Sequence, residues 1–223
     1  MLRSLAPEIM DDPSVPHETW ERFHGQLGKL HRFLGNQQAI LDALRRHPRP
    51  IGRVLDIGCG DGELLNAIRQ TLGVDVMGVE LRPPRRNKFD VPIVQADATR
   101  DRLPEADVGV SMTVFHHLAE AEIVALIRNA AHSVCRLIIL DLVRHWLPLA
   151  LFSTFLSPLL MRTVAMDGCQ SIRRAYTPSE LRAIVEGALA GSGARLVHAV
   201  TPFRSRQIID ISWTRDEAPG PPR

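Results

Sequence analysis

The feature that most constrains this chain is a glycine-rich loop placed between an apolar run and a helical stretch. The segment Arg53–Gly62 reads RVLDIGCGDG, with glycine at the alternate positions Gly58, Gly60 and Gly62. Glycine lets the backbone turn tightly and lets a ligand approach without a Cβ in the way. A buried strand that runs into such a loop and then into a helix is a nucleotide-binding geometry. The sequence therefore predicts an α/β domain with a ligand site at this loop.

Acidic side chains around the loop indicate which ligand it suits. Asp56 and Asp61 flank the glycines, and Glu80 ends the next apolar run. Negative charge at a helix N-terminus has the wrong sign for a pyrophosphate. A dinucleotide-binding loop would also need its third glycine at position 63, where Glu63 stands. Since Glu80 is placed to hold two ribose hydroxyls, the ligand is predicted to be a cationic nucleoside without phosphates, and an NAD-dependent oxidoreductase is excluded.

Apolar runs alternate with helical patterns along most of the chain. Five runs are continuously apolar, as in strands buried on both faces of a parallel sheet: residues 54–57, 74–79, 92–95, 108–112 and 137–142. Thr177–Glu180 is a capping box that begins a later helix. Two final runs, 196–200 and 207–213, are close enough to form an antiparallel hairpin. We expect an α/β fold: a doubly wound, Rossmann-like sheet of seven strands, five or so of them parallel.

The segments outside this pattern set the expected domain boundaries. Helical periodicity predicts an N-terminal helical cap over residues 1–50, followed by the α/β domain at 51–213 and a disordered tail at 214–223. The stretch Trp146–Met161 has no charged residue but holds two prolines, so it is too short and too broken for a membrane span of roughly 20 apolar residues. It is a buried core helix, a flap over a greasy pocket, or a membrane-surface helix.

Composition excludes several kinds of partner. With 27 basic and 25 acidic residues the net charge is +2, so the concentrated basic face typical of nucleic-acid binding is not expected. Cys59, Cys135 and Cys169 fit neither a disulfide framework nor a metal pattern, which favours a reducing, cytoplasmic setting. The N-terminus shows no secretory signal. The carboxylates between residues 97 and 107 have no metal-specifying spacing, so we expect no metal.

The motifs resemble those of the class I S-adenosylmethionine-dependent methyltransferases. Val54–Gly62 is similar to the first motif of that family, and Glu80 to its ribose-binding acid. Gln95–Ala98 resembles the stretch whose acid meets the adenine amino group, and Ser111–His117 resembles the fourth motif. The resemblance implies S-adenosyl-L-methionine as the cofactor. The cofactor-binding residues that it implies are Asp56, Gly58, Cys59, Gly60, Gly62, Glu80, Leu81, Asp97, Ala98 and Met112.

Two looser resemblances concern the substrate. Val114–Leu118 is similar to the ubiquinone and menaquinone biosynthesis methyltransferases, and Gln170–Pro178 to a bacterial branch that methylates phenols or polyketide-like lipids. They imply an N-terminal helix over the cofactor, a lid at about residues 145–176, and methyl transfer to oxygen, or to an activated ring carbon, of a hydrophobic small molecule. The alternative is a cofactor-binding scaffold without turnover that partners another biosynthetic enzyme. Transient contact with the inner membrane surface, and a monomer or a dimer, stay open.

Three histidines are candidate bases for the acceptor. A phenol with a pKa of about 10 is mostly protonated at neutral pH, and a positioned base contributes about 10²–10⁴-fold. His116 and His117 follow the fourth apolar run, at the edge where open α/β sheets place their sites. Adjacent side chains diverge, so we expect one of the two to face the pocket, unless both only fix the loop. His145, after the fifth run, is the third candidate.

Overall fold

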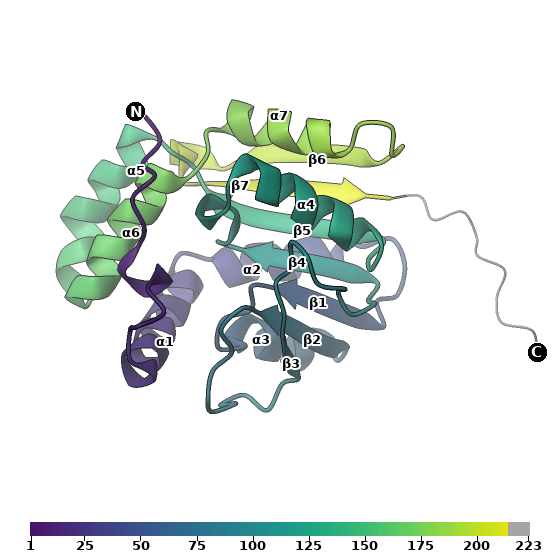
Figure 1. The fold of residues 1–223 in the computed structure, drawn as a ribbon, viewed down its shortest axis with the longest axis horizontal. Helices are drawn as coiled ribbons and strands as arrows, with labels where there is room; N and C mark the ends of the chain where they lie inside the picture. The colour runs from purple at the N-terminus through teal and green to yellow at the C-terminus, as the bar shows by residue number, and fades with distance from the viewer. Residues whose placement is uncertain (214–223) are drawn as a thin grey trace, which may run out of the picture.

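One sheet of seven strands organises the chain, in the order β3-β2-β1-β4-β5-β7-β6 (Figure 1). This computed structural model describes residues 1–213. The first five strands run parallel, and β7 pairs antiparallel with both β5 and β6. The predicted fold class is confirmed, and the hairpin places β7 inside the sheet with β6 at the edge. The strands are β1 (Arg53–Ile57), β2 (Asp75–Glu80), β3 (Ile93–Gln95), β4 (Val108–Met112), β5 (Arg136–Leu142), β6 (Arg195–Val200) and β7 (Arg206–Ser212).

Helices cover both faces of this sheet. On one face α4 (Glu120–Ala131) and α7 (Pro178–Ala188) share a buried cluster with the strands, and on the other face α2 (Asn36–Arg45) and α3 (Glu63–Leu72) do so. The central strands are therefore buried on both sides, as their continuous apolarity predicts. The Thr177 hydroxyl accepts a hydrogen bond from the Glu180 N–H, so the predicted capping box begins α7.

A third group of helices lies at one end of the sheet, on the left in Figure 1: α1 (His17–Phe33), α5 (Trp146–Leu151) and α6 (Arg162–Arg174). The group has its own small buried cluster, built on Leu30, Phe152 and Ile172. Helix α6 contacts the turn that follows β4, so these helices stand over the carboxyl ends of the parallel strands. Ligands of open α/β sheets bind at that edge.

The N-terminal segment of residues 1–16, which we call the strap, crosses this helical group beside α6 (Figure 1). The Ser4 N–H donates to the Arg173 carbonyl, and the Asp167 carboxylate accepts hydrogen bonds from the N–H groups of Ile9 and Met10. Within the strap only Ile9–Asp11 forms a helical turn. The strap is thus attached to α6 through polar contacts of its backbone and side chains rather than through an apolar core.

The uncharged segment 146–161 is not a buried core helix. Trp146, Phe155 and Leu159 are 64%, 66% and 78% exposed, because the segment is broken into short pieces that pack only one side against α1 and α6. The core interpretation is wrong for most of this segment, whereas the flap and the membrane-surface alternatives stay predictions. None of the helices between residues 1 and 213 combines the length and apolarity needed to cross a bilayer. The pieces are α5, Phe152–Leu156 and Ser157–Leu159.

The domain boundaries stay predictions. Helix α2, inside the expected N-terminal cap, packs against β4 and β5 of the sheet, whereas α1 packs against both α2 and α6. The expected tail at 214–223 lies outside the described residues.

Candidate functional site

The glycine loop between β1 and α3 adopts the backbone that its sequence requires. Gly58, Gly60 and Gly62 have φ angles of +76°, +56° and +83°, in the left-handed region that favours glycine. A Cβ on Gly58 would also lie 2.4 Å from Cγ2 of Val114, and one on Gly62 would lie 2.6 Å from Cγ2 of Val91. Both the backbone conformation and the close contacts therefore demand glycine.

The N–H groups of this loop are already bonded within the protein. Gly58 and Cys59 donate to the Val79 carbonyl at 2.8 and 3.2 Å, and Gly60 donates to Oε2 of Glu80 at 2.9 Å. A phosphate cradle would instead present such groups to its ligand. The geometry agrees with a phosphate-free ligand, and it fixes the Glu80 carboxylate beside the loop.

Asp56 is a buried carboxyl at the end of β1. Its Oδ1 atom has no hydrogen-bond partner among the described residues, although buried polar atoms are normally paired. Burial, and next the nearby charge of Glu80, raises the pKa of Asp56 to about 8. A cationic group beside both carboxyls would supply the missing partner and lower that pKa. Asp56 and Glu80 therefore fit the cationic end of the predicted ligand.

The other predicted cofactor residues lie along the same edge of the sheet. Leu81, directly after β2, is 67% exposed. Asp97, after β3, accepts hydrogen bonds from the Thr99 hydroxyl and N–H at 2.7 and 2.9 Å, and these bonds hold the pKa of Asp97 below its usual value. Because β3, β2, β1 and β4 are neighbours, their carboxyl ends are adjacent. That edge carries Cys59, Glu80, Leu81, Asp97, Ala98 and Met112.

Helix α1 covers the glycine loop. The His24 ring lies 3.0 Å from the position that a Cβ on Gly60 would take, and it stacks on Trp20 with ring centroids 3.7 Å apart. Arg32 pairs with Glu63, the first residue of α3. Burial lowers the pKa of His24. His24 carries no local sequence signal of this contact, because the contact joins residues far apart in the chain.

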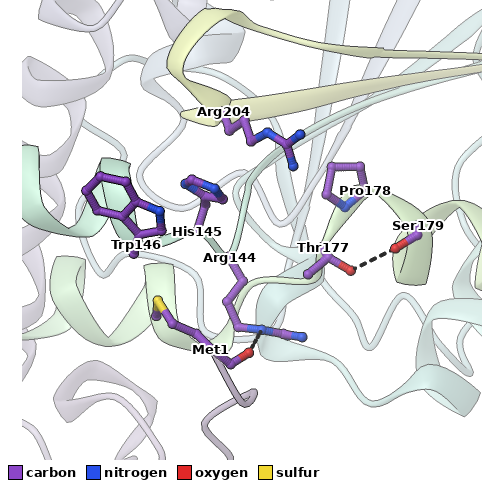
Figure 2. A pocket seen from close by; sticks show the side chains of 8 residues that line it. All are labelled: Met1, Arg144, His145, Trp146, Thr177, Pro178, Ser179 and Arg204. Carbon is purple, nitrogen blue, oxygen red and sulfur yellow. Dashed lines mark hydrogen bonds between the residues drawn. The ribbon is translucent and has the colours of Figure 1, made fainter.

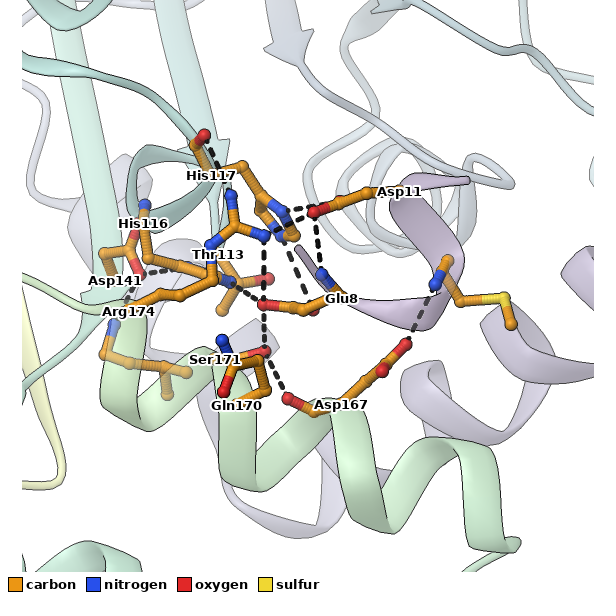
Figure 3. Close-up of polar contacts among 12 residues, drawn as sticks. Glu8, Asp11, Thr113, His116, His117, Asp141, Asp167, Gln170, Ser171 and Arg174 are labelled. Atoms are coloured by element: carbon orange, nitrogen blue, oxygen red, sulfur yellow. Dashed lines mark hydrogen bonds and ion pairs between the residues drawn. The ribbon is translucent and has the colours of Figure 1, made fainter. Parts of the chain in front are cut away.

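A second polar group, which we call the histidine cluster, brings together four separate parts of the chain (Figure 3). The turn after β4 contributes two histidines, the strap two acids, β5 one acid and α6 one arginine. These groups meet at the same edge of the sheet as the glycine loop, because β4 and β5 are parallel neighbours. The cluster consists of Glu8, Asp11, His116, His117, Asp141 and Arg174.

Carboxylates hold one nitrogen of each histidine in this cluster. Nδ1 of His116 lies 2.7 Å from Oδ1 of Asp141, whose Oδ2 accepts the His116 N–H at 3.1 Å. Nδ1 of His117 lies 3.0 Å from Oδ1 of Asp11. The two Nε2 atoms then face one carboxylate, that of Glu8, at 3.7 and 3.9 Å. Burial raises the pKa of Glu8 to about 7, against the attraction of His117.

The expectation that the two histidines diverge is wrong. Their ring centroids lie 4.2 Å apart and both Nε2 atoms face Glu8, because Phe115–His117 forms a tight helical turn and Asp141 and Asp11 hold the rings from different elements. They differ in burial: the His116 side chain is enclosed, whereas that of His117 is 32% exposed.

His145 does not belong to this cluster. It lines a cavity of about 520 Å³ together with Met1, Trp146 and Arg204 (Figure 2). Its Nδ1 accepts a hydrogen bond from the Leu147 N–H at 3.2 Å, so His145 caps the start of α5. The structure gives it this capping role, and its catalytic role stays a prediction. A second cavity, of about 620 Å³, lies between the strap and α6.

Sequence reasoning missed three residues near the two histidines. Glu8 and Asp11 come from the strap, more than a hundred positions away along the chain. His31 of α1 is buried, its Nε2 lies 3.4 Å from the Thr113 hydroxyl, and burial lowers its pKa to about 4. The positive φ of Thr113, 58°, marks the end of β4 as a special turn, but only the structure reveals it.

Comparisons with known proteins point the same way. Residues 54–136 match the family described as "Methyltransferase domain". The plantazolicin methyltransferase BpumL, solved with a monoazolic desmethylPZN analog and SAH, is similar with a TM-score of 0.70, at 14% identity and over 92% of each chain. Human N-acetylserotonin methyltransferase with SAM gives 0.63 at 15% identity, over 89% of this chain and 56% of that one. No curated protein matches the chain in sequence.

Proposed function

We propose that this chain transfers a methyl group from S-adenosyl-L-methionine to oxygen, or to an activated ring carbon, of a hydrophobic small molecule, since residues 54–136 match a methyltransferase domain and the fold is that of class I methyltransferases. The relatives solved with SAH or SAM support that cofactor. The observation that carries the proposal is the unpartnered, buried Oδ1 of Asp56 near the charge of Glu80. A sulfonium nucleoside with an ammonium group and without phosphates matches this environment.

The cofactor-binding assignments follow from the edge of the sheet. Asp56 faces the cationic amino-acid end of the cofactor, and Glu80 accepts from the ribose hydroxyls. Leu81 packs on the adenine, whose amino group donates to Asp97. The remaining contacts come from the loop residues and from the ends of β3 and β4: Gly58, Cys59, Gly60, Gly62, Ala98 and Met112. When bound, the cofactor supplies an electrophilic methyl group on a good leaving group.

Most of the rate acceleration comes from holding the methyl acceptor against the cofactor and from excluding water from the pocket. Holding two reactants together is worth roughly 7–11 kcal/mol, and exclusion of water favours a step that neutralises charge. His116 is the favoured base, because Asp141 orients its ring in the manner of a catalytic carboxylate–histidine pair, with Nε2 turned toward Glu8 of the strap. His117, held by Asp11, is the second choice, and His145 the third.

The acceptor class, the cellular setting and the assembly remain part of this proposal. The BpumL complexes hold desmethylPZN analogs, so proteins with this fold accept more than simple phenols. We keep a hydrophobic phenol, quinol or polyketide-like lipid, because exposed apolar side chains of segment 146–161 stand beside the helical group over the site. A cytoplasmic location, transient contact with the inner membrane surface, and a monomer or a dimer stay predictions, as does the absence of a nucleic-acid partner.

Calorimetric titration with S-adenosylhomocysteine tests the proposal. We expect one site per chain and a rise in melting temperature. The absence of both binding heat and a melting shift at millimolar ligand would overturn the proposed function. A panel of phenols and quinols, followed by the release of S-adenosylhomocysteine, then separates enzyme from scaffold, since binding without turnover across the panel favours the scaffold.

A further inference from the structure

The two histidines of the cluster are oriented so that the Nε2 atoms of both rings face the same carboxylate, that of Glu8. Each Nδ1 lies within hydrogen-bond distance of a carboxylate, Asp141 for His116 and Asp11 for His117, and so carries the proton. In a neutral imidazole the other nitrogen is then an acceptor. When each Nδ1–H donates to its carboxylate, both Nε2 lone pairs are directed toward the Glu8 carboxylate, at 3.7 and 3.9 Å, which is a set of donor atoms that a cation can bridge.

We propose that Glu8, His116 and His117 bind a divalent transition-metal cation of the zinc class, with the strap supplying one ligand. One ligand atom from each residue lies within 4.8 Å of the other two. Two imidazoles and one carboxylate are a known zinc donor set that leaves one position open. Metal bonds of about 2.0–2.1 Å bring tetrahedral ligands to about 3.4 Å apart. The 3.7 and 3.9 Å separations end on different oxygens of Glu8, so for one ligand atom per residue the donor atoms have to approach one another by up to about 1.4 Å.

The carboxylates behind the histidines support the same site. Metal-bound histidines commonly donate their second N–H to a carboxylate, which fixes the ring and makes the ligating nitrogen more basic. Asp141 and Asp11 hold the two rings in that way, from β5 and from the strap. The orientation of both histidines is therefore set by residues that would not touch the cation.

The charges that face the site also favour a cation. Four carboxylates gather there, those of Glu8, Asp11, Asp141 and Asp167, against the two guanidinium groups of Arg3 and Arg174. When both histidines are neutral, these carboxylates and guanidinium groups together carry a net negative charge. Arg174 pairs with Asp11 and lies 3.9 Å from Oε1 of Glu8, and the Ser171 hydroxyl donates to the same Oε1 at 2.8 Å. Both contacts use Oε1, whereas Oε2 is the oxygen nearer Nε2 of His117.

The metal site itself does not depend on the proposed function. Only the idea that the bound metal coordinates the methyl acceptor rests on that function. The open ligand position suits an oxygen donor of the methyl acceptor. In the metal-bound protein His116 and His117 are ligands, and neither acts as a base. The sequence expectation of no metal considered the carboxylates between residues 97 and 107. Glu8 gave no signal of a metal site in the sequence, because it lies far from the histidines in the chain.

The test uses the full-length, metal-stripped protein without cofactor, titrated with Zn²⁺ by calorimetry. We expect one Zn²⁺ per chain, and Glu8→Gln and His117→Asn should each weaken binding about tenfold or more. His198→Asn is the matched control, since His198 lies on β6, away from the cluster, and should bind like the parent protein.

A second measurement guards against a variant that only loosens the strap. Co²⁺ added to the unmodified protein should give the visible absorption bands of a tetrahedral nitrogen and oxygen site, and Zn²⁺ should displace it. Absence of Zn²⁺ binding, or equal binding by the parent protein, Glu8→Gln and His117→Asn, overturns the proposal. Titration of the same sample with S-adenosylhomocysteine keeps the two proposals apart: loss of zinc binding alone removes only the metal site, and loss of cofactor binding alone removes only the proposed function.

Discussion

The glycine-loop side and the histidine cluster lie along one edge of the same sheet, but they are built differently. The loop, Asp56 and Glu80 all come from one strand–helix–strand unit of fewer than thirty residues. The histidine cluster needs the strap, the turn after β4, the end of β5 and helix α6. The first is therefore local in sequence, and the second exists only when the chain has folded.

The two sides also differ in how well their polar groups are paired. Asp56 is buried with one oxygen unpartnered within the described structure, which suits a cationic ligand that binds and leaves. Glu8 faces two histidines, a serine and an arginine. Because Glu8 belongs to the strap, these contacts exist only while the strap is in place. The comparison predicts that changes on the loop side act on cofactor affinity, and changes on the cluster side act on turnover.

The largest expected effect is on turnover. In the metal-free protein, His116→Asn should lower the rate of methyl transfer by about 10²–10⁴-fold, the contribution of a positioned base, while leaving cofactor affinity unchanged. Single-turnover release of S-adenosylhomocysteine, with an acceptor found in the panel, measures it. His198→Asn serves as the control variant. If His116→Asn turns over as fast as this control, His116 does not act on the acceptor.

Cofactor affinity should respond to Glu80→Ala. The substitution removes a charged acceptor from the Gly60 N–H and from the proposed contact with the ribose hydroxyls, which should weaken binding by about 1–3 kcal/mol. Calorimetry with S-adenosylhomocysteine checks this, and Glu186→Ala, which removes an exposed carboxylate on α7, is the matched control. An unchanged affinity would take Glu80 out of the site.

How much could be predicted from sequence follows the same division. The strands, the glycine turn and the Thr177 cap were predictable because each is fixed by neighbours within a few residues. The direction of the His116 and His117 rings was not, since Asp141 and Asp11 decide it from distant elements. The exposure of segment 146–161 was misjudged for a related reason: apolar residues show that a surface can be buried, but not that a partner element is large enough to cover it.

The attachment of the strap gives a third test. Arg3 donates to the carbonyls of Arg174, His116 and Leu118, and its guanidinium lies 3.8 Å from the centroid of the Tyr176 ring. Arg3→Ala should lower the free energy of unfolding by about 2 kcal/mol, from the loss of charged hydrogen bonds. Denaturant melts measure this, with the exposed Arg102→Ala as control. The rate of methyl transfer by Arg3→Ala should also fall, whereas its affinity for the cofactor should stay unchanged. A parallel loss of cofactor affinity would show that the two sides are not separable.

The smallest effect is a pH dependence on the loop side. In the free protein burial and Glu80 raise the pKa of Asp56 to about 8, so near neutral pH its carboxyl is mostly protonated. A cationic cofactor favours the carboxylate, so binding releases a proton, and affinity should rise with pH towards about 8, by at most about tenfold per pH unit. The amino group of the ligand titrates in the same range for every variant, so the comparison with Asp56→Asn isolates the contribution of Asp56. The variant should bind more weakly at pH 8 and show a flatter rise. Equal slopes for the two proteins would mean that the cation does not approach Asp56, and the division of labour between the two sides of the site would lose its electrostatic basis.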